Sequence, residues 1–431
     1  MININSITLL KIATIIVLTV GICYNFNIAN SSKYDSYGDA ADYLQLGLSL
    51  AKTNNYGHLK YKNNENLNEN FRNNNIANTN YEFGSYSTWR PPIWPFLISG
   101  IFILFGYKLI YLIIFKFILH VLGLYIFYRT LKLINLRIEI ILIGLIFYGL
   151  NPAWQIYSRV FLSEPITLFF ITLWVYLLVE YSKRRISYWP QAIIAGILIL
   201  CHPYFIFLPF SIWGILFFNK IFTLKSITFS GILCVLIISI WVVRNMVILD
   251  TTEIVITTSA GAVMAKGWNS MVLSEHSNTK GDLANEGLVL RNYDYDTSLY
   301  YNELKRMKLF KDATFHFINS NKDLVLPIIY KKIISALNPI PEQPKPGILE
   351  TGRWIIQFLS LVAMIYIIAF IENKLIVSLV IGLLISTILI TILTYSGFRF
   401  RMPQIGIEVI FILITLQNLI FQKGKLEFNE H

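Results

Sequence analysis

The sequence predicts an all-α polytopic membrane protein with about ten transmembrane helices, further helices on the outer membrane surface and a small outer loop domain. Three observations lead to this prediction. Of the 431 residues, 55% are hydrophobic and only 14% are charged, whereas soluble domains are roughly half apolar and about a quarter charged. The apolar residues gather in runs close to the roughly 20 residues that cross a bilayer. The formal charge of +11 comes from residues mostly between these runs, which indicates membrane orientation and not nucleic-acid binding.

Ten apolar runs are predicted to cross the membrane. The first, from Ile7 to Tyr24, has neither a basic segment before it nor a small-residue cleavage site, so we expect a retained helix and not a signal peptide. Only His202 and Pro203 separate the fifth run from the sixth, and the fifth is short. The ten ranges are about 7–24, 109–128, 136–151, 164–181, 188–201, 203–219, 226–247, 352–371, 374–394 and 404–421.

One more apolar run, from Ile93 to Tyr107, is predicted to lie on the outer membrane surface. It is shorter than a typical crossing helix. With a cytoplasmic N-terminus and ten crossings, every short basic loop faces the cytoplasm, as the positive-inside rule requires, and an eleventh crossing would turn all later loops outward. These loops hold Arg129, Lys132, Arg137, Lys183, Arg184, Arg185, Lys220, Lys225, Lys374, Lys423 and Lys425.

Two long segments then face outward and divide the chain. Segment 26–108 includes twelve asparagines between Thr53 and Asn80, a composition that does not bury a core. Segment 248–350 is long enough for a small domain, with helices expected around 297–320 and 322–337 and a Pro-rich linker after them. We therefore expect an N-terminal transmembrane module (1–247) with the catalytic residues, an outer segment (248–350) and C-terminal transmembrane helices (351–431).

The first outer segment holds a group of carboxylates on one expected helix face. Asp35, Asp39 and Asp42 follow at i, i+4 and i+7, within or just before a helix predicted from Gly38 to Lys52. Three neighbouring carboxylates repel one another. A bound metal ion, a nearby basic residue or a role as proton acceptor would explain why they share one face. A solvated acidic face is the alternative. Arg90, which precedes two prolines, lies on the same side of the membrane.

Two further motifs place unusual charges at the outer rim. Ser163 is expected to cap the helix that follows, but Glu164 enters a membrane span, which is costly and indicates function. Arg399 and Arg401 break the positive-inside pattern, and a lipid phosphate or diphosphate suits them, although snorkelling anchors are the alternative. Alternate residues of an extended segment face opposite ways, so we expect only one of the two to contact a phosphate.

Taken in order, these motifs resemble those of the GT-C membrane glycosyltransferases, in particular the bacterial branch related to protein O-mannosyltransferases and lipid A aminoarabinose transferases. The resemblance covers roughly residues 1–405. The family often has Glu where this chain has Ala40, and relatives commonly have Arg where it has His202. The matching segments are Asp39 to Tyr43, Arg90 to Pro95, Tyr157 to Glu164, Trp241 to Asn245, Thr257 to Asn269 and Phe398 to Pro403.

The resemblance implies that a sugar is transferred, with inversion, from a polyprenyl-phosphate donor to an acceptor hydroxyl on the outer face of a bacterial plasma membrane. The acceptor would be a lipid, a glycan or a protein. Asp39 would be the general base, and Glu164 would orient the acceptor or a divalent metal, which some branches bind at these two carboxylates. The expected donor-phosphate ligands are Arg399, Arg401, Arg244 and His202, and the expected substrate-positioning residues are Asp42, Tyr43, Arg90, Tyr157, Arg159 and Lys266.

Other functions stay open at this point. A flippase or transporter of lipid-linked saccharides would also use outer arginines to bind a lipid phosphate, and a polysaccharide polymerase is a further alternative. Transporters usually have charged or broken helices at mid-membrane, whereas the candidates here gather at the outer rim. A scaffold without activity would leave the acidic helix and Glu164 unexplained.

Overall fold

The computed structural model describes residues 6–31, 38–61, 81–274, 302–338, 347–395 and 397–421, and these are nearly all helical. In chain order the elements are α1 (Ser6–Ser31), α2 (Asp39–Thr53), β1 (Gly57–Tyr61), β2 (Tyr81–Tyr86), α4 (Ile93–Phe105), α5 (Leu109–Leu133), α6 (Ile138–Gly149), α7 (Pro152–Tyr157), α8 (Glu164–Ser182), α9 (Trp189–Cys201), η1 (Pro203–Phe205), α10 (Phe207–Phe218), α11 (Leu224–Leu249), α12 (Ala260–Gly267), η2 (Ser270–Leu273), α13 (Glu303–Ser320), α14 (Lys322–Leu337), α15 (Ile348–Phe370), α16 (Lys374–Leu393), η6 (Phe398–Gln404) and α17 (Ile405–Phe421).

Within this part of the chain, eight helical stretches are long and apolar enough to cross a membrane. This agrees with the predicted class of polytopic membrane protein. The predicted fifth and sixth crossings are not among these eight stretches, because α9 has 13 residues and α10 has 12. Each is about 20 Å long or less, which is shorter than the roughly 30 Å hydrocarbon core. Pro203 separates them, since a proline cannot continue the hydrogen bonding of α9. The eight stretches are Ile7–Asn27, Leu109–Leu133, Ile138–Tyr157, Glu164–Ser182, Leu224–Leu249, Thr351–Phe370, Lys374–Leu393 and Arg399–Phe421.

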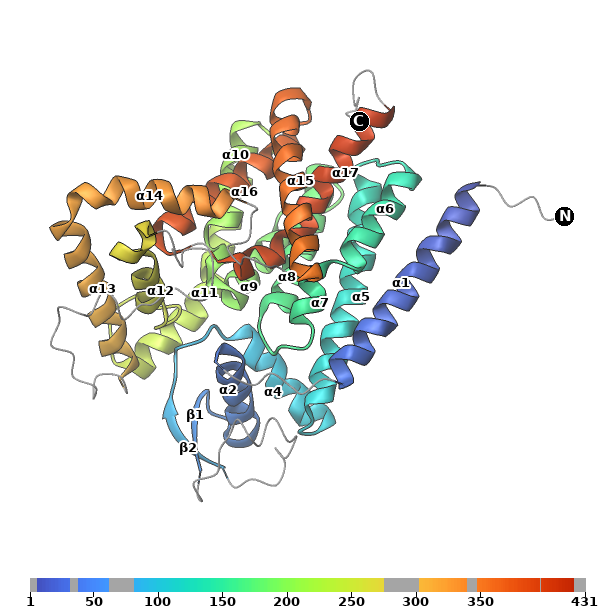
Figure 1. Ribbon diagram of the computed structural model, residues 1–431. Coiled ribbons are helices and arrows are strands. Elements are labelled where there is room, and N and C mark those ends of the chain that lie inside the picture. The colour runs from blue at the N-terminus through green and yellow to red at the C-terminus, as the bar shows by residue number, and fades with distance from the viewer. Residues whose placement is uncertain are drawn as a thin grey trace.

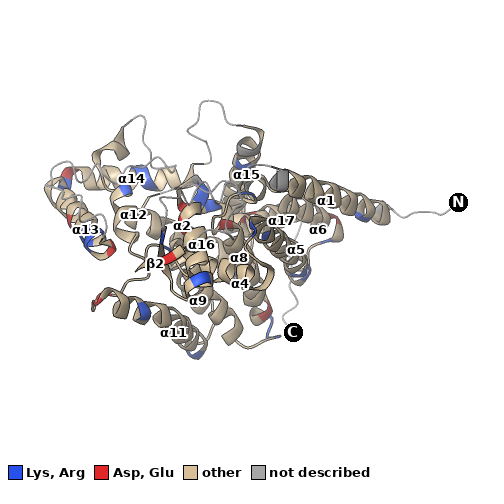
Figure 2. Ribbon diagram, turned by 90° about the horizontal axis from the view of Figure 1, so that it is seen from below, with Lys and Arg blue, Asp and Glu red and all other residues tan. Residues whose placement is uncertain are grey.

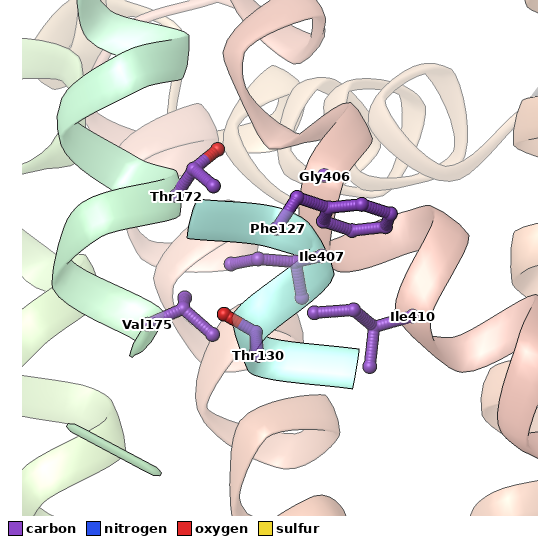
Figure 3. A pocket seen from close by; sticks show the side chains of 7 residues that line it. All are labelled: Phe127, Thr130, Thr172, Val175, Gly406, Ile407 and Ile410. Carbon is purple, nitrogen blue, oxygen red and sulfur yellow. The ribbon is translucent and has the colours of Figure 1, made fainter. Parts of the chain in front are cut away.

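The helix bundle is held by one large apolar core. Side chains of α5, α6, α8, α9, α10, α15, α16 and α17 contribute to it. Figure 1 shows α15, α17 and α6 side by side, with α1 at the edge and the start of α1 at the same end of the bundle as the end of α17. Figure 3 shows a gap between α5, α8 and α17, lined by Phe127, Thr130, Thr172, Val175, Gly406, Ile407 and Ile410. This gap contains no charged side chain and is too small for a water molecule, so it is a packing defect of the core.

A second apolar core joins α2 and α4 to the end of the bundle where both lie in Figure 1. Trp94, Ile98 and Phe102 of α4 are buried there together with Leu44 and Leu48 of α2. Gly47 lets the two helices approach, since a Cβ at this position would lie 2.5 Å from Cγ2 of Ile98. The helix predicted from Gly38 to Lys52 is therefore present as α2, and α4 is a 13-residue helix that is too short to cross alone.

The strands β1 and β2 form a small antiparallel hairpin that the all-α prediction did not include. Tyr56, just before β1, packs edge-on against Trp241 of α11, which ties the hairpin to the bundle. The asparagine-rich residues 62–80 lie outside the described part of the chain. The strands themselves have few asparagines. The composition of the asparagine-rich segment between them is the reason that the strands were not predicted.

The described residues of the second outer segment form three α-helices, α12, α13 and α14, and the short helix η2. The helices α13 and α14 lie at the predicted positions, and residues 297–301 of the first prediction lie outside the described part of the chain. Ala262 and Ala265 of α12 pack against Phe310 and Ala313 of α13, and Ile328 of α14 packs against Trp268. Figure 2 shows acidic and basic residues on α13, basic residues on α14, and both kinds again near α2. Other charged residues lie at the ends of spanning helices, such as Lys132 of α5 and Lys183 after α8.

Candidate functional site

Arg90 binds two of the carboxylates on the predicted acidic face. Gly38, with φ of 55°, turns the chain into α2 in a conformation that favours glycine. Asp39 and Asp42 follow in the first helical turn. Nη2 of Arg90 contacts Oδ1 of Asp39, and its Nε and Nη2 lie 3.0 Å and 2.7 Å from Oδ2 of Asp42. The acidic face is therefore paired with a guanidinium and is not simply solvated, while Asp35 lies outside the described residues.

Arg399 bridges Asp39 to Glu164, which is 125 residues further along the chain. Its Nη2 lies 2.7 Å from Oδ2 of Asp39, and its Nε lies 2.8 Å from Oε1 of Glu164. The Glu164 side chain is only 2% exposed and begins α8, where the helix dipole favours a negative charge. We call these five residues (Asp39, Asp42, Arg90, Glu164 and Arg399) the Asp39 cluster.

The two arginines determine the ionisation of Asp39. Burial alone would raise its pKa, but the positive charges of Arg90 and Arg399 and their hydrogen bonds outweigh burial. The pKa of Asp39 is therefore held well below its usual range. Asp39 is ionised at neutral pH, but it is a weak base as long as both guanidinium groups contact it.

Lys116 is a buried cation next to this cluster that the sequence analysis did not single out. It lies inside the span α5, and its Nζ donates to the carbonyl oxygens of Ser158 and Val160. It also interacts electrostatically with Glu164. A lysine within a span was a usable signal, because such residues are rare and usually paired. Lys116 therefore adds a buried basic side chain beside the carboxylates and guanidinium groups of the Asp39 cluster.

Tyr43 joins α2 to the start of α8. Its hydroxyl lies 3.3 Å from Oγ of Ser163, and the Arg90 guanidinium lies 5.7 Å from the centre of its ring. Ser163 occupies the N-cap position of α8, but its side chain makes no capping hydrogen bond. The predicted capping role of this side chain is therefore wrong, because its hydroxyl faces Tyr43 instead.

Glu303, the first residue of α13, holds the segment that carries Arg90. Ser87 Oγ donates to it at 2.6 Å and the Thr88 amide at 2.8 Å. Thr258 Oγ1 and Nε2 of His58 lie 2.9 Å and 3.1 Å from its carboxylate oxygens. These contacts hold the pKa of Glu303 at about 2, although its burial acts in the opposite direction. The outer segment thus fixes the backbone that leads to the Asp39 cluster.

We expect Glu303→Gln to lower the thermal stability of the detergent-purified protein at neutral pH. Each hydrogen bond to a charged group contributes about 1.5–3 kcal/mol, and an amide can replace only part of this set. Because the pKa of Glu303 is lowered, its contribution is fully present above about pH 5 and is lost as the pH falls towards about 2. Melting curves between pH 7 and pH 3 should therefore show a difference between variant and parent that shrinks in acid.

Glu253→Gln is the matched control in the same outer segment. Glu253 pairs with Lys308 at 2.9 Å, but both side chains are more than a third exposed, and such pairs contribute little. Equal melting temperatures for Glu303→Gln and the parent at pH 7 would contradict the role assigned to Glu303.

The other predicted phosphate ligands lie in different surroundings. Nη1 of Arg401 donates to the Ala336 carbonyl at 2.6 Å, and no contact between Arg401 and Asp39 is seen among the described residues. Arg244 donates to the backbone carbonyls of Ser87 and Tyr56 at 2.9 Å and 3.0 Å, so it fastens the hairpin segment. Burial, together with the nearby positive charge of Arg399, lowers the pKa of His202 to about 3. His202 is therefore neutral at physiological pH.

Three predicted substrate-positioning residues lie apart from the Asp39 cluster. Tyr157 ends α7 and packs between the two apolar cores. Arg159 is exposed in the loop before α8. Lys266, in the last turn of α12, lies 5.7 Å from the centre of the Tyr395 ring. The structure thus brings Asp42, Tyr43 and Arg90 to the cluster, but not these three.

The Asp39 cluster does not fit a divalent metal as it is arranged. Its two proposed metal ligands, Asp39 and Glu164, are joined by the Arg399 guanidinium. Nor do three metal-binding side chains of the His, Cys, Asp or Glu type converge anywhere in the described part of the chain.

Comparison of the chain with protein-family models, curated proteins and solved structures finds no match. The sequence motifs and the geometry of the Asp39 cluster are therefore the basis for assigning a function.

Proposed function

We propose that this protein is a membrane glycosyltransferase that moves a sugar from a polyprenyl phosphate to an acceptor hydroxyl on the outer face of the membrane. The observation that carries the proposal is the bridge from Arg399 to Asp39 and Glu164. It joins a candidate base, a second carboxylate and a candidate phosphate ligand, which come from three motifs far apart in the sequence. Such a juxtaposition of titratable groups, perturbed by named partners, is typical of catalytic sites.

The donor phosphate would compete with Asp39 for Arg399. Both guanidinium groups of the Asp39 cluster already contact carboxylates, so an arriving phosphodiester must take guanidinium hydrogen bonds from a carboxylate. A guanidinium fork binds phosphate and carboxylate with similar geometry. When Arg399 turns to the phosphate, the pKa of Asp39 rises, because one of the two guanidinium groups that lower it has moved away. Donor binding would therefore prepare the base.

The transfer itself needs a proton acceptor and a stabilised leaving group. Asp39 would take the proton of the acceptor hydroxyl as its oxygen attacks the anomeric carbon. The bond between that carbon and the phosphate oxygen breaks, and the polyprenyl phosphate leaves with one more negative charge, which Arg399 stabilises. Attack from the side opposite the leaving phosphate gives inversion. Glu164 would hold Arg399 and orient the acceptor.

The proposal includes ten crossings, with α4 on the outer surface of a bacterial plasma membrane and with the Asp39 cluster on the outer side. Whether α9 and α10 both cross the membrane or neither does, every other segment stays on the same side of the membrane. The basic residues of the short loops then all face the cytoplasm.

Two lysines at opposite ends of α5 test this topology. Lys108 precedes α5 and Lys132 lies in its last turn, and both are exposed. In a background in which the exposed Cys23 is replaced by Ser, Lys108→Cys should react with an impermeant thiol reagent added to intact cells, and Lys132→Cys should not. The reverse pattern would place Glu164 on the cytoplasmic side and contradict the proposed site.

The activity is tested by product formation in detergent. The purified protein, incubated with a radiolabelled polyprenyl-phosphate sugar and a panel of lipid, glycan and peptide acceptors, should release polyprenyl phosphate and label an acceptor. A flippase would move the lipid across vesicles without forming a product. Movement of the donor across vesicles without transfer to any acceptor would favour the transporter.

A further inference from the structure

Three buried charged residues around η6 form a second group, whose partners differ from those of the Asp39 cluster. Arg353 of α15 and Glu408 of α17 are both fully buried, and Arg401 of η6 is 8% exposed. Nη1 of Arg353 lies 2.6 Å from Oε2 of Glu408, and its Nη2 lies 3.3 Å from Oε1. Nη2 of Arg401 lies 3.5 Å from the same Oε1. We call Arg353, Arg401 and Glu408 the Glu408 cluster.

This cluster contacts the backbone of η6 directly. Nη2 of Arg353 donates to the carbonyl oxygen of Arg401 at 3.0 Å. Nη1 of Arg401 donates at 2.6 Å to the carbonyl of Ala336, in the last turn of α14. The short helix η6 is therefore fastened at one residue to α14, α15 and α17.

Arg399 lies two residues before this fastening point and contacts two other helices. Its guanidinium reaches Asp39 of α2 and Glu164 of α8. An arginine side chain has many rotamers, and ordering it costs conformational entropy. A fixed backbone at η6 lowers this cost, because it limits where the guanidinium can go. Partners that orient a ligand-binding side chain typically affect affinity or activity about 10- to 100-fold when removed.

The buried charges have no evident role in packing alone. Two arginines and one glutamate leave one excess positive charge within an apolar bundle, and an apolar trio of similar volume would often be at least as stable. An apolar side chain cannot hold a backbone carbonyl in one orientation, whereas a guanidinium group can. This need would explain why charged residues are buried at this position.

We propose that Arg353 and Glu408 are positioning residues, which fix η6 so that Arg399 points at the donor phosphate and at Asp39. This inference rests on the proposed function for the role of Arg399, but the fastening of η6 does not. Arg401 belongs to the fastening and not to the phosphate site.

The first test measures η6 without any substrate. In the full-length protein in detergent, Glu408→Gln should increase hydrogen–deuterium exchange in peptides that cover Phe398–Gln404, while exchange in α2 changes little. Glu139→Gln is the control, since Glu139 pairs with Arg137 in an exposed ion pair and should leave η6 unchanged. Unchanged exchange at η6 in Glu408→Gln would overturn the inference whatever the binding data show.

The second test uses undecaprenyl phosphate as the probe. We expect Glu408→Gln to weaken its binding about tenfold, Arg399→Ala to weaken it further, and the double variant to bind no worse than Arg399→Ala. Such non-additivity is expected if Glu408 acts through Arg399, whereas the product of the two single losses would overturn the inference. If Glu408→Gln does not fold, Arg353→Lys serves instead, because it keeps the charge and loses the fork.

The two tests separate the inference from the proposed function. Increased exchange at η6 with lipid binding unaffected by Arg399→Ala would support the fastening and contradict the donor site. Loss of binding in Arg399→Ala without any loss in a folded Glu408→Gln would support the donor site and overturn the positioning role.

Discussion

Asp39→Asn is expected to reduce sugar transfer by about 10²–10⁴-fold, the range typical for loss of a general base. The asparagine keeps the size of the side chain but cannot accept the hydroxyl proton. Steady-state transfer with a labelled polyprenyl-phosphate sugar measures this loss. The pKa of Asp39 lies well below its usual range in the free protein, so kcat/KM of the parent should not fall between pH 8 and pH 5 through protonation of this residue.

The same variant should keep or strengthen its binding of undecaprenyl phosphate. In the parent, Oδ2 of Asp39 holds Nη2 of Arg399 at 2.7 Å, and the phosphate must displace it. A neutral amide competes less for the guanidinium. Asp42→Asn is the matched control from the same helical turn, since Asp42 contacts Arg90, and we expect a loss of transfer below tenfold. Near-parental transfer in Asp39→Asn, or an equal loss in Asp42→Asn, would contradict the assignment of the base.

Periodicity and composition predicted those parts of the fold that depend on local pattern. Eight of the predicted apolar runs are long helices, and the i, i+4, i+7 spacing placed Asp39 and Asp42 on one face of α2. The short helices α9 and α10 lie where the fifth and sixth apolar runs were predicted, but with 13 and 12 residues they are not among the eight stretches long enough to cross. The hairpin was missed because its two strands are separated by 19 residues of different composition.

The partners of each charged residue could not be predicted from the sequence. The predicted topology puts Asp39, Arg90, Glu164 and Arg399 on one side of the membrane, but it does not predict which arginine contacts which carboxylate. Arg399 and Arg401 contact different partners, but the extended segment on which that expectation rested is wrong, because Phe398–Gln404 form the short helix η6. Which of them faces α2 depends on the packing of η6 between α8 and α17. Lys116 was passed over because its run is otherwise apolar, although a charge inside a span is informative.

Arg399→Ala is expected to weaken binding of undecaprenyl phosphate ten- to over a hundredfold and to reduce transfer by more than it reduces binding. A charge-assisted hydrogen bond contributes about 1.5–3 kcal/mol, which sets the binding loss. The additional loss of rate follows because the departing phosphate gains negative charge that the guanidinium stabilises in the transition state. Arg399→Lys should recover only part of both, since an ammonium lacks the planar fork that spans two oxygens.

Removal of Arg399 also leaves the buried Glu164 without the guanidinium at 2.8 Å, and an uncompensated buried charge destabilises a fold strongly. The double variant Arg399→Ala with Glu164→Gln removes that charge and should restore the melting temperature towards that of the parent. If this double variant regains stability but still binds undecaprenyl phosphate weakly, the loss belongs to Arg399 as a phosphate ligand. If the double variant regains binding as well, the weak binding of the single variant was caused by the Glu164 carboxylate that had lost Arg399. The donor phosphate would then be held by other residues.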